Sequence, residues 1–273
     1  MKTQAEKAAA FQALHLRPNA FVIPNPWDIG TARLLEHFGF EALATTSAGY
    51  AFSVGKADNT ADRFSVMQHV ATLATASDLP VSADLGNGFG DEPRMAAEAI
   101  QLAALAGAVG GSIEDATGRA DHPIYEHAQA VERVKAAVET TRALPFPFTL
   151  TARAENYLYG KPDLKDTIKR LQLYQSAGAD VLYAPGIVKR DDIAALLGSV
   201  DRPVNVLTAI PGITLTLQEL SALGVRRVSV GSALSRLAMT TVLRAAQEMS
   251  EHGTFSFAEN ALSFREINKL LQT

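Results

Sequence analysis

The sequence predicts an α/β protein with the architecture of a (β/α)8 TIM barrel, in which eight parallel strands alternate with eight helices. Eight short β-rich segments alternate along the chain with eight helical segments, without a break in composition that would separate two domains. Four helices end in a glycine just before the next strand, in "HFGFEAL", "LAGAVGG", "SAGADVL" and "ALGVRRV". With 273 residues, 47% of them hydrophobic, the chain can bury one large core. An open, doubly wound sheet is the alternative fold.

Each β-rich segment is a short run of apolar and β-branched residues bounded by polar residues, glycine or proline. In chain order these segments cover 20–25, 41–47, 80–86, 108–115, 148–156, 179–186, 203–209 and 225–231. The helical segments that follow them cover 28–38, 62–77, 93–106, 125–142, 164–177, 190–198, 216–223 and 232–250.

Two further helices flank the eight units. The first residues, "MKTQAEKAAAFQALH", form an amphipathic pattern with charges throughout, and 255–271 carries an aromatic and leucine-rich face that needs a packing partner. We therefore expect a barrel domain over 1–253, including the N-terminal helix, and a helical extension over 254–273. A neighbouring subunit is the expected partner of that extension.

Composition excludes several classes of protein. The net charge of −4, with scattered Lys and Arg, gives no basic patch for nucleic acid. The absence of cysteine excludes disulfides, thiolate metal sites and a cysteine nucleophile. The N-terminal segment does not read as a signal sequence, and no apolar stretch approaches membrane-spanning length. We expect a soluble cytoplasmic protein that binds neither nucleic acid nor membrane.

Charged residues stand at the carboxyl ends of three successive predicted strands, where a barrel carries its chemistry. Asp84, Glu114 and Arg153 occupy equivalent positions there, and alternation along each strand turns all three inward. Oxygen ligands without histidine or cysteine suit Mg²⁺ or Mn²⁺. The alternative is a structural layer of ion pairs at the mouth of the barrel.

Four motifs in order resemble the isocitrate lyase/phosphoenolpyruvate mutase superfamily: "TTSAGY…GKADN", "SADLGNGFGD", "SIEDATGR" and "TARAEN". The resemblance covers about residues 18–245. It implies a Mg²⁺-dependent barrel that acts on small 2-oxo or 2-hydroxy carboxylic acids and breaks or moves a C–C or P–C bond through an enolate-like intermediate. It also implies a homo-oligomer, a dimer or homotetramer, whose paired subunits exchange their last helix.

The resemblance assigns substrate contacts at two places. The turn Ser47-Ala48-Gly49 matches the segment that holds the substrate carboxylate, and its backbone N–H groups can form an anion nest; a plain strand-ending turn is the alternative. Tyr50, beside that turn, is a candidate for the rim of the substrate site. Arg119, in the loop after the fourth strand, is a candidate for gripping the distal group of the substrate, although solvated loop surface is the simpler interpretation.

The same resemblance assigns metal and catalytic roles to acids. Asp84 matches a metal-site acid, Glu114 matches the acid of the family's Glu-Asp pair, and Arg153 matches the substrate-binding arginine. Asp58 matches an acid that hydrogen-bonds water on the metal; a turn or cap residue is its alternative role. The glycines of 86–90 would then let the backbone run close to the bound ligand, and Asp91 would cap the next helix.

The chain departs from the family pattern at two points. Ser82 stands where the motif has its first aspartate, so one metal bond becomes weaker or passes to water. The loop after the fourth strand, "ATGRADHPIYEHA", lacks the Lys-x-Cys-Gly-His motif of the isocitrate and methylisocitrate lyases and has Arg119 where the mutases have lysine. Those activities are therefore not expected.

Three functions remain open. The first is a Mg²⁺-dependent lyase that cleaves a C–C bond by decarboxylation or by retro-aldol or Claisen chemistry. The second is a P–C bond enzyme, a phosphonopyruvate hydrolase or phosphoenolpyruvate mutase, in which Arg119 helps to hold the phosphonate. The third is a non-catalytic carboxylate-binding barrel that has lost its metal.

Overall fold

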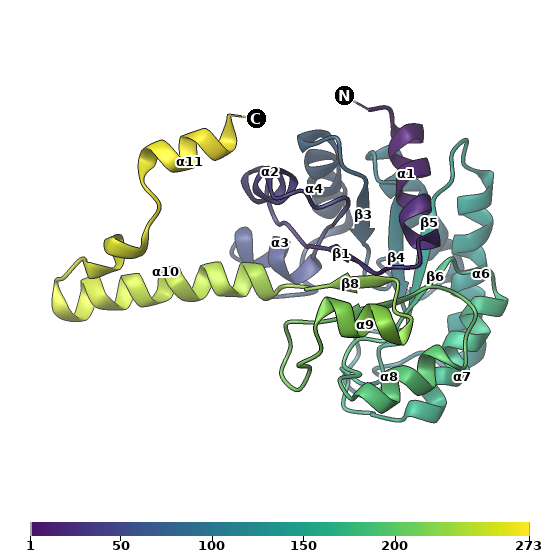
Figure 1. Ribbon diagram of the computed structural model, residues 1–273. Coiled ribbons are helices and arrows are strands. Elements are labelled where there is room, and N and C mark those ends of the chain that lie inside the picture. Colours follow the sequence, from purple (N-terminus) through teal and green to yellow (C-terminus); the bar gives the residue numbers. More distant parts are fainter. Residues whose placement is uncertain (1, 273) are drawn as a thin grey trace.

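A computed structural model describes residues 2–272, and its centre is one sheet of eight parallel strands curved into a barrel (Figure 1). The strands are β1 (Phe21–Ile23), β2 (Leu43–Ala44), β3 (Val81–Asp84), β4 (Gly110–Glu114), β5 (Thr149–Arg153), β6 (Val181–Tyr183), β7 (Val204–Leu207) and β8 (Arg227–Ser229). Their order in the sheet is β1-β8-β7-β6-β5-β4-β3-β2. The predicted barrel is therefore confirmed.

The ends of the sheet, β1 and β2, are joined by a few hydrogen bonds instead of a ladder. The Ala44 N–H donates to the Pro24 carbonyl at 3.0 Å. Asn25, just after β1, donates to the Thr45 carbonyl at 3.1 Å and accepts from the Gly231 N–H at 2.9 Å. This one side chain ties the carboxyl ends of β1, β2 and β8 together and so joins the two edges of the sheet beside the mouth of the barrel.

The helices largely follow the predicted segments. They are α1 (Gln4–Leu16), α2 (Ile29–His37), α3 (Ser47–Ser53), α4 (Arg63–Ala76), α5 (Pro93–Leu105), α6 (His127–Ala143), α7 (Leu164–Ser176), α8 (Arg190–Leu197), α9 (Leu217–Leu223), α10 (Ala233–His252) and α11 (Phe264–Leu271). None of the helices within residues 2–272 combines the length and the hydropathy that a membrane span requires.

Helix α1 covers the amino-terminal end of the barrel. Phe11 and Leu14 are buried against Phe21 and Val109, which lie at or just before the first residues of their strands. Gly110 allows this contact, since a Cβ there would lie 2.7 Å from the Phe11 ring. The barrel is thus plugged at one end and open only at the end where the strands terminate.

Two parts of the chain differ from the sequence-based expectation. The residues Ser47-Ala48-Gly49, predicted to form a turn, are instead the beginning of the short helix α3. The segment 255–271, predicted to be one helix, is a 3-10 turn over Ser256–Asn260 followed by α11. The break falls between Ala261 and Ser263, where Ser263 caps α11 with its side chain and so starts a new helix.

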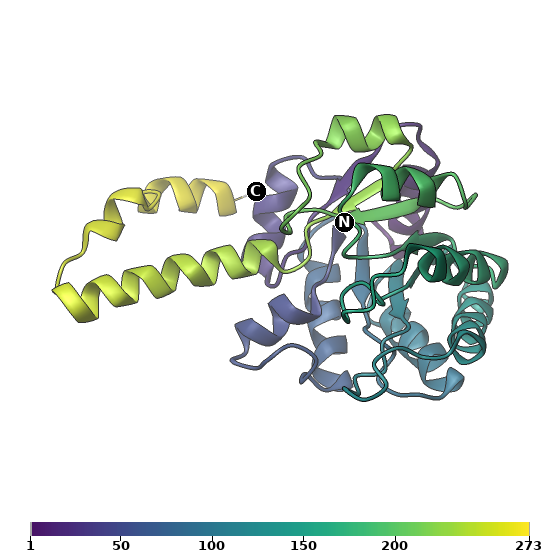
Figure 2. The same cartoon turned by 90° about the horizontal axis from the view of Figure 1, so that it is seen from below.

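The last helices leave the barrel. Figure 2 shows α10 extending away from the strands and α11 folding back, so that α11 contacts α2. Apolar side chains along α10 are exposed, among them Leu237 at 64%, Val242 at 69% and Leu243 at 58%. The eighth helix of this barrel therefore does not cover its own sheet.

Candidate active site

Arg153, the last residue of β5, lies at the centre of a cluster of carboxylates at the mouth of the barrel. Its Nη1 lies 2.9 Å from Asp84 Oδ1, its Nη2 3.1 Å from Glu114 Oε2, and its Nε 2.8 Å from Glu155 Oε1. Its guanidinium also lies over the Tyr183 ring, 5.1 Å from the ring centre. Three strands that neighbour each other in the sheet, β3, β4 and β5, supply the cluster, because strand alternation turns the residues at their ends inward.

Burial dominates the electrostatics of this cluster. Burial alone would lower the pKa of Arg153, but Glu155, Glu114 and Asp84 together raise it well above its ordinary value. Burial raises the pKa of Glu114 well above the usual range, Arg153 opposes that shift, and Glu155 and Asp84 reinforce it. The pKa of Glu155 is raised for the same reason. One guanidinium therefore faces three carboxyl groups, and a cation bound beside them would favour their ionised forms.

Asp84 is held from the side of β2. The Thr45 hydroxyl accepts from the Asp84 N–H at 2.8 Å, and the Ser47 N–H donates to Asp84 Oδ2 at 3.0 Å. With Arg153 on the other oxygen, both carboxylate oxygens have a fixed partner. The carboxylate therefore has one orientation in the absence of a ligand.

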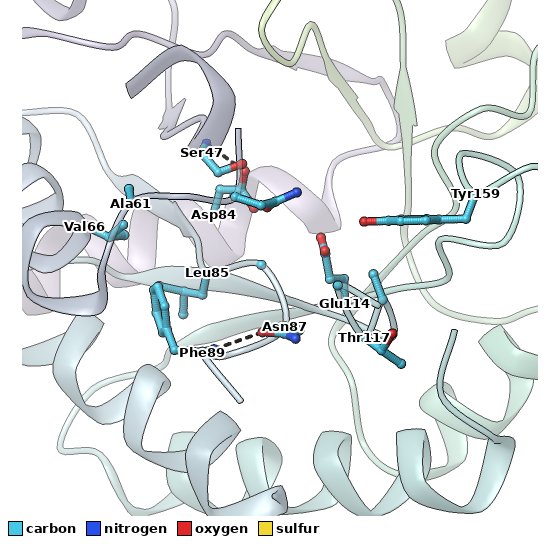
Figure 3. Close-up of a pocket in the computed structure, with 14 residues that line it drawn as sticks. Ser47, Ala61, Val66, Asp84, Leu85, Asn87, Phe89, Glu114, Thr117 and Tyr159 are labelled. Carbon is cyan, nitrogen blue, oxygen red and sulfur yellow. Dashed lines mark hydrogen bonds between the residues drawn. The ribbon is translucent and has the colours of Figure 1, made fainter. Parts of the chain in front are cut away.

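Two cavities open around Asp84 and share the Ser47 and Asp84 side chains. The upper one, about 270 Å³, lies between the glycine loop after β3 and the loop after β4, and Glu114 and Tyr159 line it. Figure 3 shows the Tyr159 hydroxyl pointing across this cavity towards Glu114. The lower cavity, about 190 Å³, runs past Arg153 into the barrel.

Asp58 lies on the rim of the lower cavity, in the segment between α3 and α4. Burial raises its pKa, the Asn59 N–H opposes that shift, and nearby Asp84 adds to it. The structure thus brings Asp58 to the same site as Asp84 and Arg153, although it belongs to none of the strands.

The residues Ser47-Ala48-Gly49 form the first turn of α3. Two of their N–H groups already have partners, because Ser47 donates to Asp84 and Gly49 donates to the Thr46 hydroxyl at 3.2 Å. Gly49 is required there, since a Cβ would lie 2.5 Å from the Thr46 methyl group. The open anion nest expected from sequence is therefore partly occupied by the protein's own side chains.

Three other sequence candidates lie at the edges of the site. The Tyr50 ring stacks on His69, 4.2 Å between ring centres, and lines neither cavity. Arg119 donates to Asp91 Oδ2 at 2.5 Å, so its guanidinium is held at the outer end of the glycine loop. Ser82 is buried two residues below Asp84 and lines the lower cavity, not the upper one that contains Glu114.

Asp91 does not cap the following helix as expected. The N-cap residue of α5 is Glu92, and its side chain makes no capping hydrogen bond. The Asp91 carboxylate instead accepts from Arg119 and from the Tyr125 hydroxyl, the latter at 2.6 Å. It thereby fastens the loop after β4 to the glycine loop. Gly88 is needed where the glycine loop packs against α5, because its φ is +78° and a Cβ would lie 2.9 Å from the Ala96 Cα.

Sequence reasoning did not assign a role to the residues behind Arg153. Glu155 is 2% exposed, and its N–H donates to Asp115 Oδ1 at 2.8 Å. Asp115 in turn accepts from Arg170 and from the Tyr174 hydroxyl, at 3.1 Å and 2.5 Å. Strand alternation indicates Glu155, which lies two residues after Arg153. Tyr159 lies in an irregular segment, where no periodic pattern could indicate it.

The acidic side chains at the mouth of the barrel could hold a divalent cation. Within residues 2–272 no three His, Cys, Asp or Glu side chains converge as a complete metal site. Asp84 and Glu114 still offer two carboxyl groups to one cavity. Mg²⁺ is often bound by one or two carboxylates while water and substrate oxygens fill its other positions. The residues present therefore fit Mg²⁺ or Mn²⁺.

Comparison with known proteins gives consistent matches along most of the chain. The sequence family described as phosphoenolpyruvate phosphomutase matches residues 11–250. An uncharacterized protein of Mycobacterium tuberculosis is 33% identical over 245 residues, which are 89% of each chain. An oxaloacetate decarboxylase of a Bradyrhizobium species is 29% identical over 217 residues, 75% of this chain and 70% of that one.

Among solved structures, a lyase/mutase from Burkholderia cenocepacia, so described without an assigned substrate, is 62% identical to this chain. The alignment covers 99% of this chain and 97% of that one, with a TM-score of 0.96. The likeness thus includes the helices that leave the barrel.

Proposed function

The chain belongs to the phosphoenolpyruvate phosphomutase family of the isocitrate lyase superfamily, and from that premise we propose that it is a divalent-metal-dependent lyase. Its reaction is the cleavage of a C–C bond in a small 2-oxo or 2-hydroxy carboxylic acid, by decarboxylation or by retro-aldol or Claisen chemistry. The observation that carries this proposal is the guanidinium of Arg153, fixed by three carboxylates beside a cavity.

Arg153 is the group that holds the developing charge. Glu155 fixes Nε from behind, so the plane of the guanidinium is set before a substrate arrives. Nη1 and Nη2 each keep a second N–H that can donate to a carboxylate or enolate oxygen. A donor that is already in place costs no reorganisation when the bond breaks, and its contribution therefore falls on the transition state.

Asp84 and Glu114 would hold the metal, with the Ser82 hydroxyl a weaker candidate below them. When bound there, a divalent cation polarises substrate oxygens and stabilises negative charge on them. Asp58, whose pKa is raised, lines the same cavity as Asp84 and Arg153 and would hold or pass a proton there. At the start of α3 the Ala48 N–H would help to position the substrate carboxylate, since the N–H groups of Ser47 and Gly49 already donate to Asp84 and Thr46.

The proton that ends the reaction has a candidate donor in Tyr159. The breaking bond leaves its electron pair on a carbon of the enolate, and that carbon must take a proton. Burial raises the pKa of Tyr159 to about 12, and Glu114 adds to the shift, so the phenol keeps its proton at neutral pH. The chain has no cysteine for this role, and the phenolate formed would recover its proton from water.

The phosphonate alternative has less support. It relied on Arg119 to hold a phosphonate, but that guanidinium is paired with Asp91. The non-catalytic alternative requires that the barrel bind a carboxylate but no metal.

A substrate assay separates these functions. We expect pyruvate release from oxaloacetate-like acids, abolished by EDTA and restored by Mg²⁺ or Mn²⁺, and no phosphate release from phosphonopyruvate. Mg²⁺ with oxalate should raise the melting temperature, because a ligand of the native state stabilises it. Phosphate release would favour the phosphonate enzyme, and an unchanged melting temperature would favour the non-catalytic barrel.

We also propose a homo-oligomer in which α10 packs on a neighbouring subunit. Its exposed apolar residues lie on a helix that its own barrel leaves uncovered. The whole of α10, and not the last segment alone, would be the exchanged element. A monomer in sedimentation at micromolar concentration would contradict this.

A further inference from the structure

A second arginine, Arg227, lies deeper in the barrel, on the first residue of β8. Its side chain is inside the barrel, with 5% of the residue exposed. Its Nε donates to Asn205 Oδ1 at 3.0 Å and its Nη2 to Thr151 Oγ1 at 2.9 Å. Its Nη1 lies 3.4 Å from His15 Nε2. The His15 Nδ1 faces the Phe11 carbonyl at 2.8 Å, so Nε2 is the acceptor of a neutral ring.

All three partners of Arg227 are neutral. Among residues 2–272 no carboxylate forms an ion pair with it, whereas Arg153 has three. Burial lowers the pKa of Arg227, Tyr183 opposes the shift and the nearby Arg153 adds to it, so that the pKa is about 10. A buried charge normally has a counter-charge, because desolvation costs several kcal/mol per ion. This guanidinium lacks one.

The lower cavity gives a counter-ion both access and room. Arg227 lines that cavity of about 190 Å³, together with Ser82, Asn205 and Ser229. These neighbours offer hydroxyl and amide groups and no negative charge. The two acids that line the cavity, Asp58 and Asp84, stand at its rim. An anion that passes the rim therefore meets a positive group at the floor, with neutral donors around it.

We propose that the Arg227 guanidinium is an anion-binding site at the floor of the barrel cavity, and that it takes a small, singly charged anion. That anion is either a halide from solution or the carboxylate arm of a ligand held at the rim. The geometry allows the second source. Arg227 contacts Thr151, which lies two residues before Arg153 on β5, and both arginines line the same cavity.

The first arm of the test concerns free halide. The melting temperature of the wild-type protein is measured in sodium chloride and in sodium gluconate at equal ionic strength, without metal. Gluconate is too bulky for the cavity floor and serves as the matched control. We expect stabilisation by chloride that saturates with concentration in the wild type and is absent in Arg227→Gln.

The second arm concerns a carboxylate arm, and it rests on the proposed function. Malate and lactate share a 2-hydroxy acid head, and only malate has a second carboxylate. With Mg²⁺ present, malate should bind about 10- to 100-fold more tightly than lactate, which is the fold-change expected for a charged hydrogen bond pair. Arg227→Gln and Arg227→Lys should lose this preference, because both lack the planar fork.

The outcomes separate the two sources and the two hypotheses. Chloride stabilisation alone identifies a halide site, and a malate preference identifies a ligand arm. If chloride acts like gluconate and malate binds like lactate in the wild type, the inference is overturned, whether or not the variants fold. Effects that survive in Arg227→Gln overturn it too. Binding of oxalate with Mg²⁺ is measured separately, as a test of the proposed metal and substrate site at the rim. If oxalate does not bind, the proposed function is contradicted, while the halide test of Arg227 remains valid.

Discussion

Replacing Arg153 by lysine and by alanine tests whether the arginine acts in catalysis or only in structure. Arg153→Lys keeps one positive charge among Asp84, Glu114 and Glu155, but a single ammonium cannot reproduce three contacts of 2.8–3.1 Å from one rigid plane. If the guanidinium stabilises charge in the transition state, turnover should fall by about 10²- to 10³-fold while the protein still folds.

Arg153→Ala removes the guanidinium that pairs with one buried and two half-buried carboxylates. We expect the free energy of unfolding to fall by about 3–5 kcal/mol, the usual cost of leaving a buried charge unpaired. For a protein of this size that corresponds to a loss of roughly 10 °C in melting temperature. The cost should shrink at lower pH, because the carboxylates left behind can be protonated.

Urea unfolding and pyruvate release measured on both variants decide between the two roles. Arg170→Lys is the matched control, because Arg170 also pairs with a buried acid, Asp115, but lines neither cavity. It should lose stability and keep the turnover of its folded fraction. A fully active Arg153→Lys protein beside an alanine variant that barely folds would refute the catalytic role.

Four further results are expected. Asp84→Ala should abolish the rise in melting temperature with Mg²⁺ and oxalate, and unchanged metal binding by calorimetry would remove Asp84 from the metal site. Tyr159→Phe should lower kcat with little change in KM and slow the uptake of solvent deuterium into pyruvate, whereas Tyr157→Phe should do neither, because Tyr157 lines neither cavity. The free energy of unfolding should fall as the pH is lowered from 6.5, the ordinary histidine pKa, to about 3. In that range buried His15 stays neutral in the folded state while the unfolded chain binds the proton. In His15→Gln the free energy of unfolding, measured by urea titration, should depend less on pH in that range. Leu243→Glu should lower the assembly state in sedimentation, and an unchanged oligomer would exclude the exposed face of α10 from the interface.

The barrel could be predicted because its signals are local and repeated. Apolar, β-branched residues indicate each strand, and a cap residue or a terminal glycine indicates each helix. A wrong assignment at one element therefore does not affect the next. The exceptions lie where local signals conflict or are weak. The pattern of 255–271 reads as a continuous helical face, but the Ser263 capping box restarts the helix there. The helix α3 is too short for a periodic pattern to indicate it.

The meeting of Asp84, Glu114 and Arg153 could also be predicted, because parallel strands bring their carboxyl ends to one edge and alternation fixes the inward side. The sequence alone therefore determined the fold class, the edge of the sheet at which the candidate site lies and three of its charged groups. Only the tertiary structure showed that Arg119 is paired with Asp91, that Tyr159 faces Glu114, and that α10 leaves the barrel. These depend on loops and on contacts between segments far apart in the chain, where no periodicity relates sequence to position. The neutral surroundings of Arg227 belong to the same class, since its partners lie on β5, β7 and α1 and meet only inside the closed barrel.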